Sequence, residues 1–94
     1  MKNYIASKLS SGNLIFPSVI EIMDNSVIIK RPSLLSTKER TIPFNRISSV
    51  SYESPFIGFS SITIETNGES SEKINGFYKS DVLEIKNIIL SKIQ

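Results

Sequence analysis

The sequence predicts a single, mainly β domain of the α+β class, in which a curved antiparallel sheet is capped by a C-terminal helix. Short segments rich in β-branched residues, separated by turn residues, fill the middle of the chain. The last segment changes to helical spacing, with one apolar stripe at Val82, Ile85, Ile89 and Ile93. The length of 94 residues suits one domain with one hydrophobic core.

We take residues 1–94 as the domain. Its first thirteen residues are a weakly defined lead-in. Tyr4, Ile5 and Leu9 fit either a short strand or a turn of helix, so the element type stays open. The Ser10-Ser11-Gly12-Asn13 stretch is typical of a loop.

A β-hairpin follows the lead-in. Pro17 excludes a helix interior, and Ser18–Met23 is predicted as a strand with Ile20 and Ile22 on one face. Asp24-Asn25 is predicted as a tight turn, because both residues tolerate positive φ. The partner strand then covers residues 26–31.

The next two strands are predicted at Glu39–Phe44 and Ser48–Glu53. Pro43 lacks a backbone donor, which indicates an edge strand or a bulge. In the second strand, the alternation places Val50 and Tyr52 inward.

The clearest strand is Ser60–Thr66, which ends at the hairpin signal Asn67-Gly68. Glu72–Asn75 is predicted as the last strand, ended by the Asn75-Gly76 pair.

The final helix is predicted from about residue 81 to residue 93. Asp81, with Glu84 three residues later, matches a capping box, and Ser80 is an alternative cap. The apolar stripe needs a partner, and the inward faces of the strands supply it. The helix therefore covers one side of the sheet.

Composition excludes several classes of function. The chain has no histidine and no cysteine, which removes the usual general base, thiolate nucleophile and metal ligands. We therefore expect no enzyme, no metal and no cofactor. The net charge of only +2, with acids and bases interspersed, argues against nucleic-acid binding. No apolar run approaches a membrane span or a signal peptide, so we expect a cytoplasmic protein.

Four segments together resemble the pleckstrin-homology-like (PH-like) fold, and more specifically the bacterial PH domain family. They are V-I-I-K-R (27–31), R-T-I-P-F-N-R-I-S-S-V (40–50), P-F-I-G-F-S-S-I-T-I-E-T-N-G (55–68) and the stretch from I-N-G-F to the final isoleucine (74–93). The resemblance covers roughly residues 14–93. It implies a barrel or two-sheet sandwich of six to seven strands with a capping helix, and a role in binding or assembly. Some small bacterial members resemble ring-forming homo-oligomers.

Four cations form the candidate ligand site: Lys30, Arg31, Lys38 and Arg40. The spacing of Lys30, Lys38 and Arg40 is similar to that by which eukaryotic PH domains hold inositol phosphates. A hairpin is expected to place Lys30 opposite Lys38 and Arg40, and convergent cations bind phosphate. The plainer interpretation, solvated charges on a hairpin, is favoured because charged side chains are mostly exposed.

The apolar corner, which we define as Pro55, Phe56, Ile57 and Phe59, has two interpretations. It either packs inward as core, which we favour, or protrudes as a subunit interface. Gly58 within it is expected to adopt a backbone conformation that a side chain would obstruct.

Three functions remain in this order. The first is a non-enzymatic interaction module that self-associates or binds a protein partner, for which an exposed sheet edge offers a second contact. The second is an anionic-ligand or peripheral membrane-surface binder that uses the basic hairpin. The third is an enzyme built from carboxylates, for which no residue pair stands out.

Overall fold

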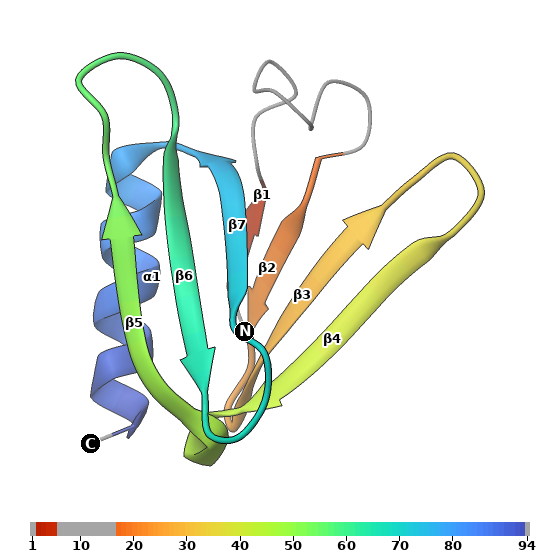
Figure 1. Ribbon diagram of the computed structural model, residues 1–94, viewed down its shortest axis with the longest axis vertical. Coiled ribbons are helices and arrows are strands. Elements are labelled where there is room, and N and C mark those ends of the chain that lie inside the picture. Colours follow the sequence, from red (N-terminus) through yellow and green to blue (C-terminus); the bar gives the residue numbers. More distant parts are fainter. Residues whose placement is uncertain (1, 6–16, 94) are drawn as a thin grey trace.

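The computed structural model describes residues 2–5 and 17–93, and for Lys2 and Asn3 only the backbone. These residues form two antiparallel sheets and a C-terminal helix (Figure 1). The first sheet has the order β1 (Lys2–Ile5), β2 (Val19–Ile22), β3 (Ser26–Pro32) and β4 (Thr37–Pro43). The second has the order β5 (Ile47–Glu53), β6 (Ser60–Thr66) and β7 (Glu72–Phe77). The 3-10 turn η1 (Phe44–Arg46) joins the sheets, and α1 (Lys79–Ile93) follows β7.

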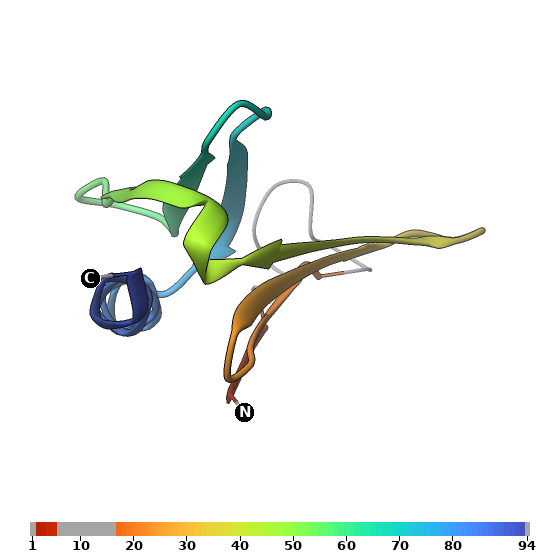
Figure 2. The ribbon, with the colours of Figure 1, turned by 90° about the horizontal axis from the view of Figure 1, so that it is seen from below.

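The predicted fold class is confirmed as a PH-like sandwich, mainly β, with a capping helix. Of the two forms expected, the sandwich is correct and the barrel is wrong, because in the described residues the two sheets do not join into a closed barrel. Viewed from below, the sheets diverge and the β3–β4 hairpin extends away from α1 (Figure 2).

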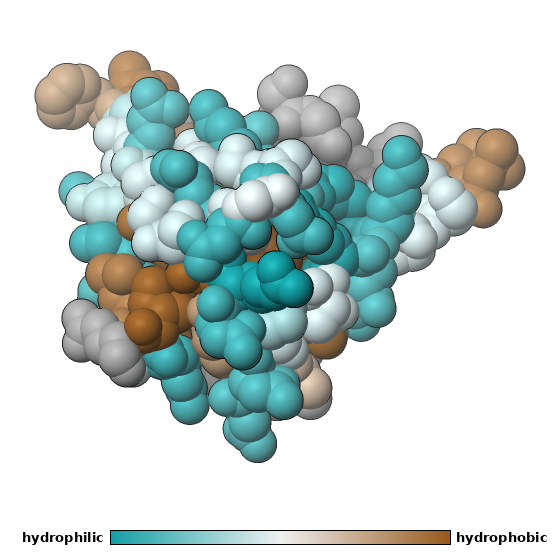
Figure 3. Space-filling model, turned by 60° about the horizontal axis from the view of Figure 1, so that its bottom comes forward, coloured by the Kyte–Doolittle hydropathy of each residue, from teal (hydrophilic) through white to brown (hydrophobic). Residues whose placement is uncertain are grey.

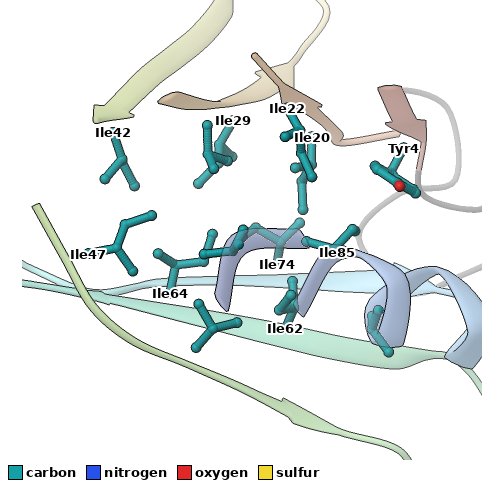
Figure 4. Close-up of a cluster of buried hydrophobic side chains, with 14 of the residues drawn as sticks. Tyr4, Ile20, Ile22, Ile29, Ile42, Ile47, Ile62, Ile64, Ile74 and Ile85 are labelled. Carbon is teal, nitrogen blue, oxygen red and sulfur yellow. The ribbon is translucent and has the colours of Figure 1, made fainter. Parts of the chain in front are cut away.

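The core lies between the two sheets and under α1. Its members are β-branched or aromatic, which suits the pleated surface of a strand. Isoleucines from both sheets point toward one another in Figure 4, and Val82, Ile85 and Ile89 of the predicted helical stripe are fully buried with them. Ile93, the fourth residue of that stripe, is only partly buried. The buried hydrophobic residues are Tyr4, Ile20, Ile22, Val27, Ile29, Ile42, Phe44, Ile47, Val50, Ile62, Ile64, Ile74, Phe77, Val82, Ile85 and Ile89.

The first predicted hairpin is present, although the reason given for its turn is wrong. Ile20 and Ile22 are buried, and the Met23 N–H donates to the Ser26 carbonyl at 2.9 Å across Asp24-Asn25. No described residue other than glycine has a positive φ, so this turn uses ordinary right-handed conformations. The prediction of an edge position for Pro43 is confirmed, since β4 is an edge strand.

The prediction that Asn75-Gly76 ends the last strand is wrong, because Gly76 lies inside β7. Ser61 pairs with Asn75, whereas its neighbour Ser60 pairs with Phe77, so Gly76 is the extra residue of a β-bulge. Its φ of 97° is accessible to glycine at little cost. The bulge continues β7 to Phe77, which is buried in the core.

The helix begins at Lys79, two residues before the predicted start. Asp81 lies within the first turn, where its N–H and that of Val82 donate to the Tyr78 carbonyl at 3.0 and 3.1 Å. The capping box is therefore wrong. Glu84 instead accepts a hydrogen bond from the Tyr4 hydroxyl at 2.6 Å.

Tyr4 lies in the N-terminal segment for which the sequence allowed either a strand or a turn of helix. Residues 2–5 form strand β1, which pairs with β2 and buries Tyr4. The predicted loop at residues 10–13 lies outside the described residues. Tyr52, predicted inward, is 39% exposed, and the Lys86 Nζ lies 5.4 Å from its ring centroid.

Candidate interaction surfaces

The register of the β3–β4 hairpin separates the four predicted cations. Arg31 pairs with Lys38, and Ile29 pairs with Arg40. Directly opposed residues lie on one face of a sheet, so Arg31, Lys38 and Arg40 share the face that carries the core residue Ile29. Lys30 lies on the other face, and its predicted approach to Lys38 and Arg40 is wrong.

On that outer face, Lys30 contacts two acids. Its Nζ lies 3.1 Å from a carboxylate oxygen of Glu21 and 3.9 Å from one of Glu39. Both neighbours follow from the register, because Glu39 is directly opposite Lys30 and Glu21 lies on the adjacent strand β2. Lys30 therefore belongs to a row of alternating charges.

Two of the inner-face cations converge on one carboxylate. Arg31 Nη1 lies 2.7 Å from Glu72 Oε1, and Arg40 Nη1 lies 2.6 Å from Glu72 Oε2. We call Arg31, Arg40 and Glu72 the clasp. It joins the first sheet to β7 of the second sheet beyond the end of the apolar core.

Backbone carbonyls complete the clasp. Arg40 Nη1 also donates to the Ser70 carbonyl at 2.9 Å, and Arg31 Nη2 donates to the Lys73 carbonyl at 3.2 Å. A second acid, Glu69, lies 3.4 Å from Arg40 Nη2. Charge-assisted bonds of this kind are stronger than neutral ones, and each arginine uses several of its donors here.

The electrostatics of the clasp agree with its geometry. Burial alone would raise the pKa of Glu72, but the hydrogen bonds from Arg40 and Arg31 outweigh it and hold that pKa below its usual range. The hydrogen bond to Glu72 is also the largest cause that raises the pKa of Arg40. The carboxylate is thus charged at neutral pH and balances part of the basic cluster.

Lys38 differs from the other three cations. Among the residues that the structure describes, no ion pair involves it. Ligand binding by Lys30, Arg31, Lys38 and Arg40 stays a prediction. The two-residue period of β3 could have revealed the split, because Arg31, and not Lys30, has the parity of the core residues Val27 and Ile29.

The apolar corner protrudes from the β5–β6 loop at the upper end of the molecule (Figure 1). Phe56 and Ile57 are 109% and 91% exposed, and Pro55 is exposed with them. The interpretation of these residues as core is wrong, because the loop leaves the sheet after the last ladder pair, Glu53 with Ser61.

Phe59 behaves differently from the rest of the corner. Its ring packs against Tyr78 at a centroid distance of 5.6 Å and an interplanar angle of 59°. This tilted geometry is favourable for aromatic pairs and anchors the returning end of the loop beside α1. Gly58 has a φ of 104°, so the expected special conformation is confirmed. Phe56 and Ile57 therefore protrude into solvent, while Phe59 holds the end of the loop against Tyr78.

A second apolar tip escaped the sequence interpretation. Leu34 and Leu35 in the β3–β4 loop are 81% and 93% exposed. A turn supports them, in which the Ser33 hydroxyl donates to the Ser36 carbonyl at 2.9 Å. In Figure 3 hydrophobic side chains protrude at two distant corners of the molecule. The sequence signal that could have indicated this tip is the pair of adjacent leucines between two serines.

Within residues 2–5 and 17–93, no group of three or more acidic side chains gathers as a metal site would require. In that same part of the chain, no helix has the length and apolarity needed to cross a membrane.

Comparison with known proteins identifies a family. The family model described as the bacterial PH domain matches residues 16–93 of this chain. No curated protein and no solved structure matches it significantly.

Proposed function

The chain belongs to the bacterial PH domain family, whose fold generally serves as an interaction module, and we propose that this domain is non-enzymatic and self-associates through its apolar corner. The fold alone does not identify a partner. The argument for self-association rests on the surface that this particular chain presents.

The observation that carries the proposal is the exposure of Phe56 and Ile57. An adjacent aromatic and β-branched residue, both fully outside the core, form the kind of anchor on which interfaces depend. Burying each side chain contributes about 1.5–3 kcal/mol. The packing of Phe59 on Tyr78 holds the base of the loop, so less conformational freedom is lost on association.

The other contact considered, pairing of sheet edges, is disfavoured for the registers centred on the charged residues of β4. In a symmetric antiparallel pair, each residue faces a residue of the same face in the partner. Centring the pair on Lys38 or on Arg40 sets like charges opposite each other. Centring it on Glu39 opposes two glutamates and also brings Lys38 against Arg40. Like charges opposite each other destabilise a sheet, and the apolar corner has no such penalty.

Anionic-ligand or membrane-surface binding remains the second function. The clasp argues against it as the main role, because Glu72 already occupies Arg31 and Arg40. Lys30 is likewise engaged on the opposite face by Glu21 and Glu39.

The test is the absolute mass in solution, measured by light scattering behind a sizing column over a wide range of concentrations. We expect the wild type to give a multiple of the 10.5 kDa chain, and the double variant Phe56→Ser, Ile57→Ser to give a monomer. The matched control is Leu34→Ser, Leu35→Ser, which removes an equally exposed apolar pair from the other tip.

The control should keep the wild-type mass. A wild type that is monomeric at every concentration contradicts self-association. Loss of the oligomer in the control, with retention in the corner variant, would transfer the interface to the β3–β4 tip.

A further inference from the structure

We propose that the corner of one copy inserts into a hollow at the opposite end of the next copy, which makes the interface head-to-tail. This inference rests on the proposed self-association and specifies its second surface. The hollow has a volume of about 450 Å³ and an apolar wall formed by Pro43, Phe44 and Ile93. Its polar rim includes Asp24, Asn45 and Lys92.

The hollow follows from the way the sheets are joined. β4 ends at Pro43, and the chain turns through η1, which buries Phe44. The last turn of α1 reaches the same place, where Ile93 packs only partly against the core. A gap remains between the turn, the β2–β3 hairpin and the end of the helix. Figure 3 shows hydrophobic surface framed by hydrophilic side chains on this end.

The corner and the hollow lie at opposite ends of the molecule. In Figure 1 the β5–β6 loop is at the upper end, whereas η1, the β2–β3 turn and the end of α1 are at the lower end. The corner therefore cannot fill the hollow of its own chain. A symmetric corner-to-corner dimer would leave the hollow open, whereas insertion of the corner of one copy into the hollow of the next covers both surfaces.

The size and charge of the two surfaces suit each other. The hollow is open to solvent, and its volume of about 450 Å³ is large enough to receive the Phe56 and Ile57 side chains. The corner is flanked by the exposed Glu53, whose carboxylate lies 3.7 Å from Lys73 Nζ, and the rim of the hollow carries both Asp24 and Lys92. Each surface thus has one acid and one base, and they are complementary when Glu53 faces Lys92 and Lys73 faces Asp24.

The two surfaces of a head-to-tail interface can be disrupted separately, each in its own variant. The first is Phe56→Ser, Ile57→Ser, which loses the corner and keeps the hollow. The second is Asn45→Arg, which puts a bulky cation into the hollow beside Lys92 at an exposed position outside the core. Lys92→Glu is a third variant, which reverses the rim charge without entering the apolar wall. Thermal unfolding by circular dichroism checks that each variant is folded.

Each of the first two variants alone should have the mass of one chain. Mixed in equal amounts, they should form a dimer of twice 10.5 kDa and nothing larger, because one intact corner meets one intact hollow. Lys92→Glu should weaken the wild-type assembly, and the weakening should diminish at high salt.

Two results overturn the inference and leave the proposed function intact. In one, Asn45→Arg keeps the wild-type mass while the corner variant is monomeric, which indicates a corner contact elsewhere. In the other, the two monomeric variants fail to form a dimer when mixed. A monomeric wild type instead contradicts the proposed function itself.

Discussion

The two sheets are held together in different ways on the two sides of the sandwich. Near α1 the contact is apolar, through buried side chains such as Ile20 of the first sheet, Ile74 of the second sheet and Ile85 of the helix. On the side of the extended β3–β4 hairpin the contact is ionic, through the clasp of Arg31, Arg40 and Glu72. The apolar side gains free energy in proportion to buried area, whereas the ionic side depends on donor and acceptor geometry.

This difference suggests a division of roles. Apolar burial is non-directional and supplies most of the stability. The clasp gains less, because its arginines are partly exposed and screened by solvent. What it adds is a fixed position of the hairpin relative to β7.

The largest effect on stability is expected from Ile74→Ala, which leaves a cavity in the apolar core between the sheets. The free energy of unfolding should fall by about 2–5 kcal/mol. Urea denaturation measures it. The matched control is Ile28→Ala, a half-buried isoleucine on the outer face of β3, which should cost clearly less. Equal losses would show that the apolar contact is not concentrated between the sheets.

An intermediate effect is expected from Glu72→Gln, which leaves both arginines without their carboxylate. We expect a loss of about 1–3 kcal/mol at neutral pH. The control Glu65→Gln, an exposed carboxylate on the outer face of β6, should be nearly neutral. A Glu72→Gln variant as stable as the control would mean that the clasp contributes nothing measurable.

The same variant should also change the dependence of stability on pH. The pKa of Glu72 is lowered in the folded state, so its contribution is complete above the unfolded pKa, about 4.3. The contribution is lost as the pH falls through the lower, folded pKa. The difference in stability between wild type and Glu72→Gln should therefore shrink in acid, and urea denaturation between pH 7 and pH 2 measures it.

The smallest effect is expected from Tyr4→Phe, which removes the hydrogen bond to Glu84 and keeps the ring. Burial, followed by that hydrogen bond, raises the pKa of Tyr4, so its hydroxyl remains a donor. The expected loss is about 0.5–1.5 kcal/mol. Hydrogen exchange should show faster opening of β1, while Tyr78→Phe, at an exposed ring, should leave β1 unchanged. Unchanged exchange in Tyr4→Phe would refute a role for this bond in holding the strand.

Most of the fold could be predicted because its elements have a clear period. The α1 stripe, the β6 strand and the inward isoleucines of β2 all follow from spacing alone. β1 could not be assigned, because only Tyr4 and Ile5 carried a signal and its partner strand lies more than ten residues away. Gly76 was assigned to a turn, since a bulge and a strand end have the same local sequence.

The interaction surfaces were harder to predict, because exposure depends on where a loop leaves the sheet. Phe56 looks like a core residue in sequence, yet it lies beyond the ladder and no strand covers it. The clasp was missed because Glu72 is far from Arg31 and Arg40 in the chain. No local pattern indicates such a contact before the sheets are placed.

The bond between Tyr4 and Glu84 has a consequence for the order in which the protein assembles. It joins residues 80 positions apart, so it cannot form until nearly all of the described chain has been synthesised. Closing so long a loop costs entropy that only neighbouring contacts can offset. Strand β1, although it precedes the other described elements in the chain, is thus among the last to be locked in place.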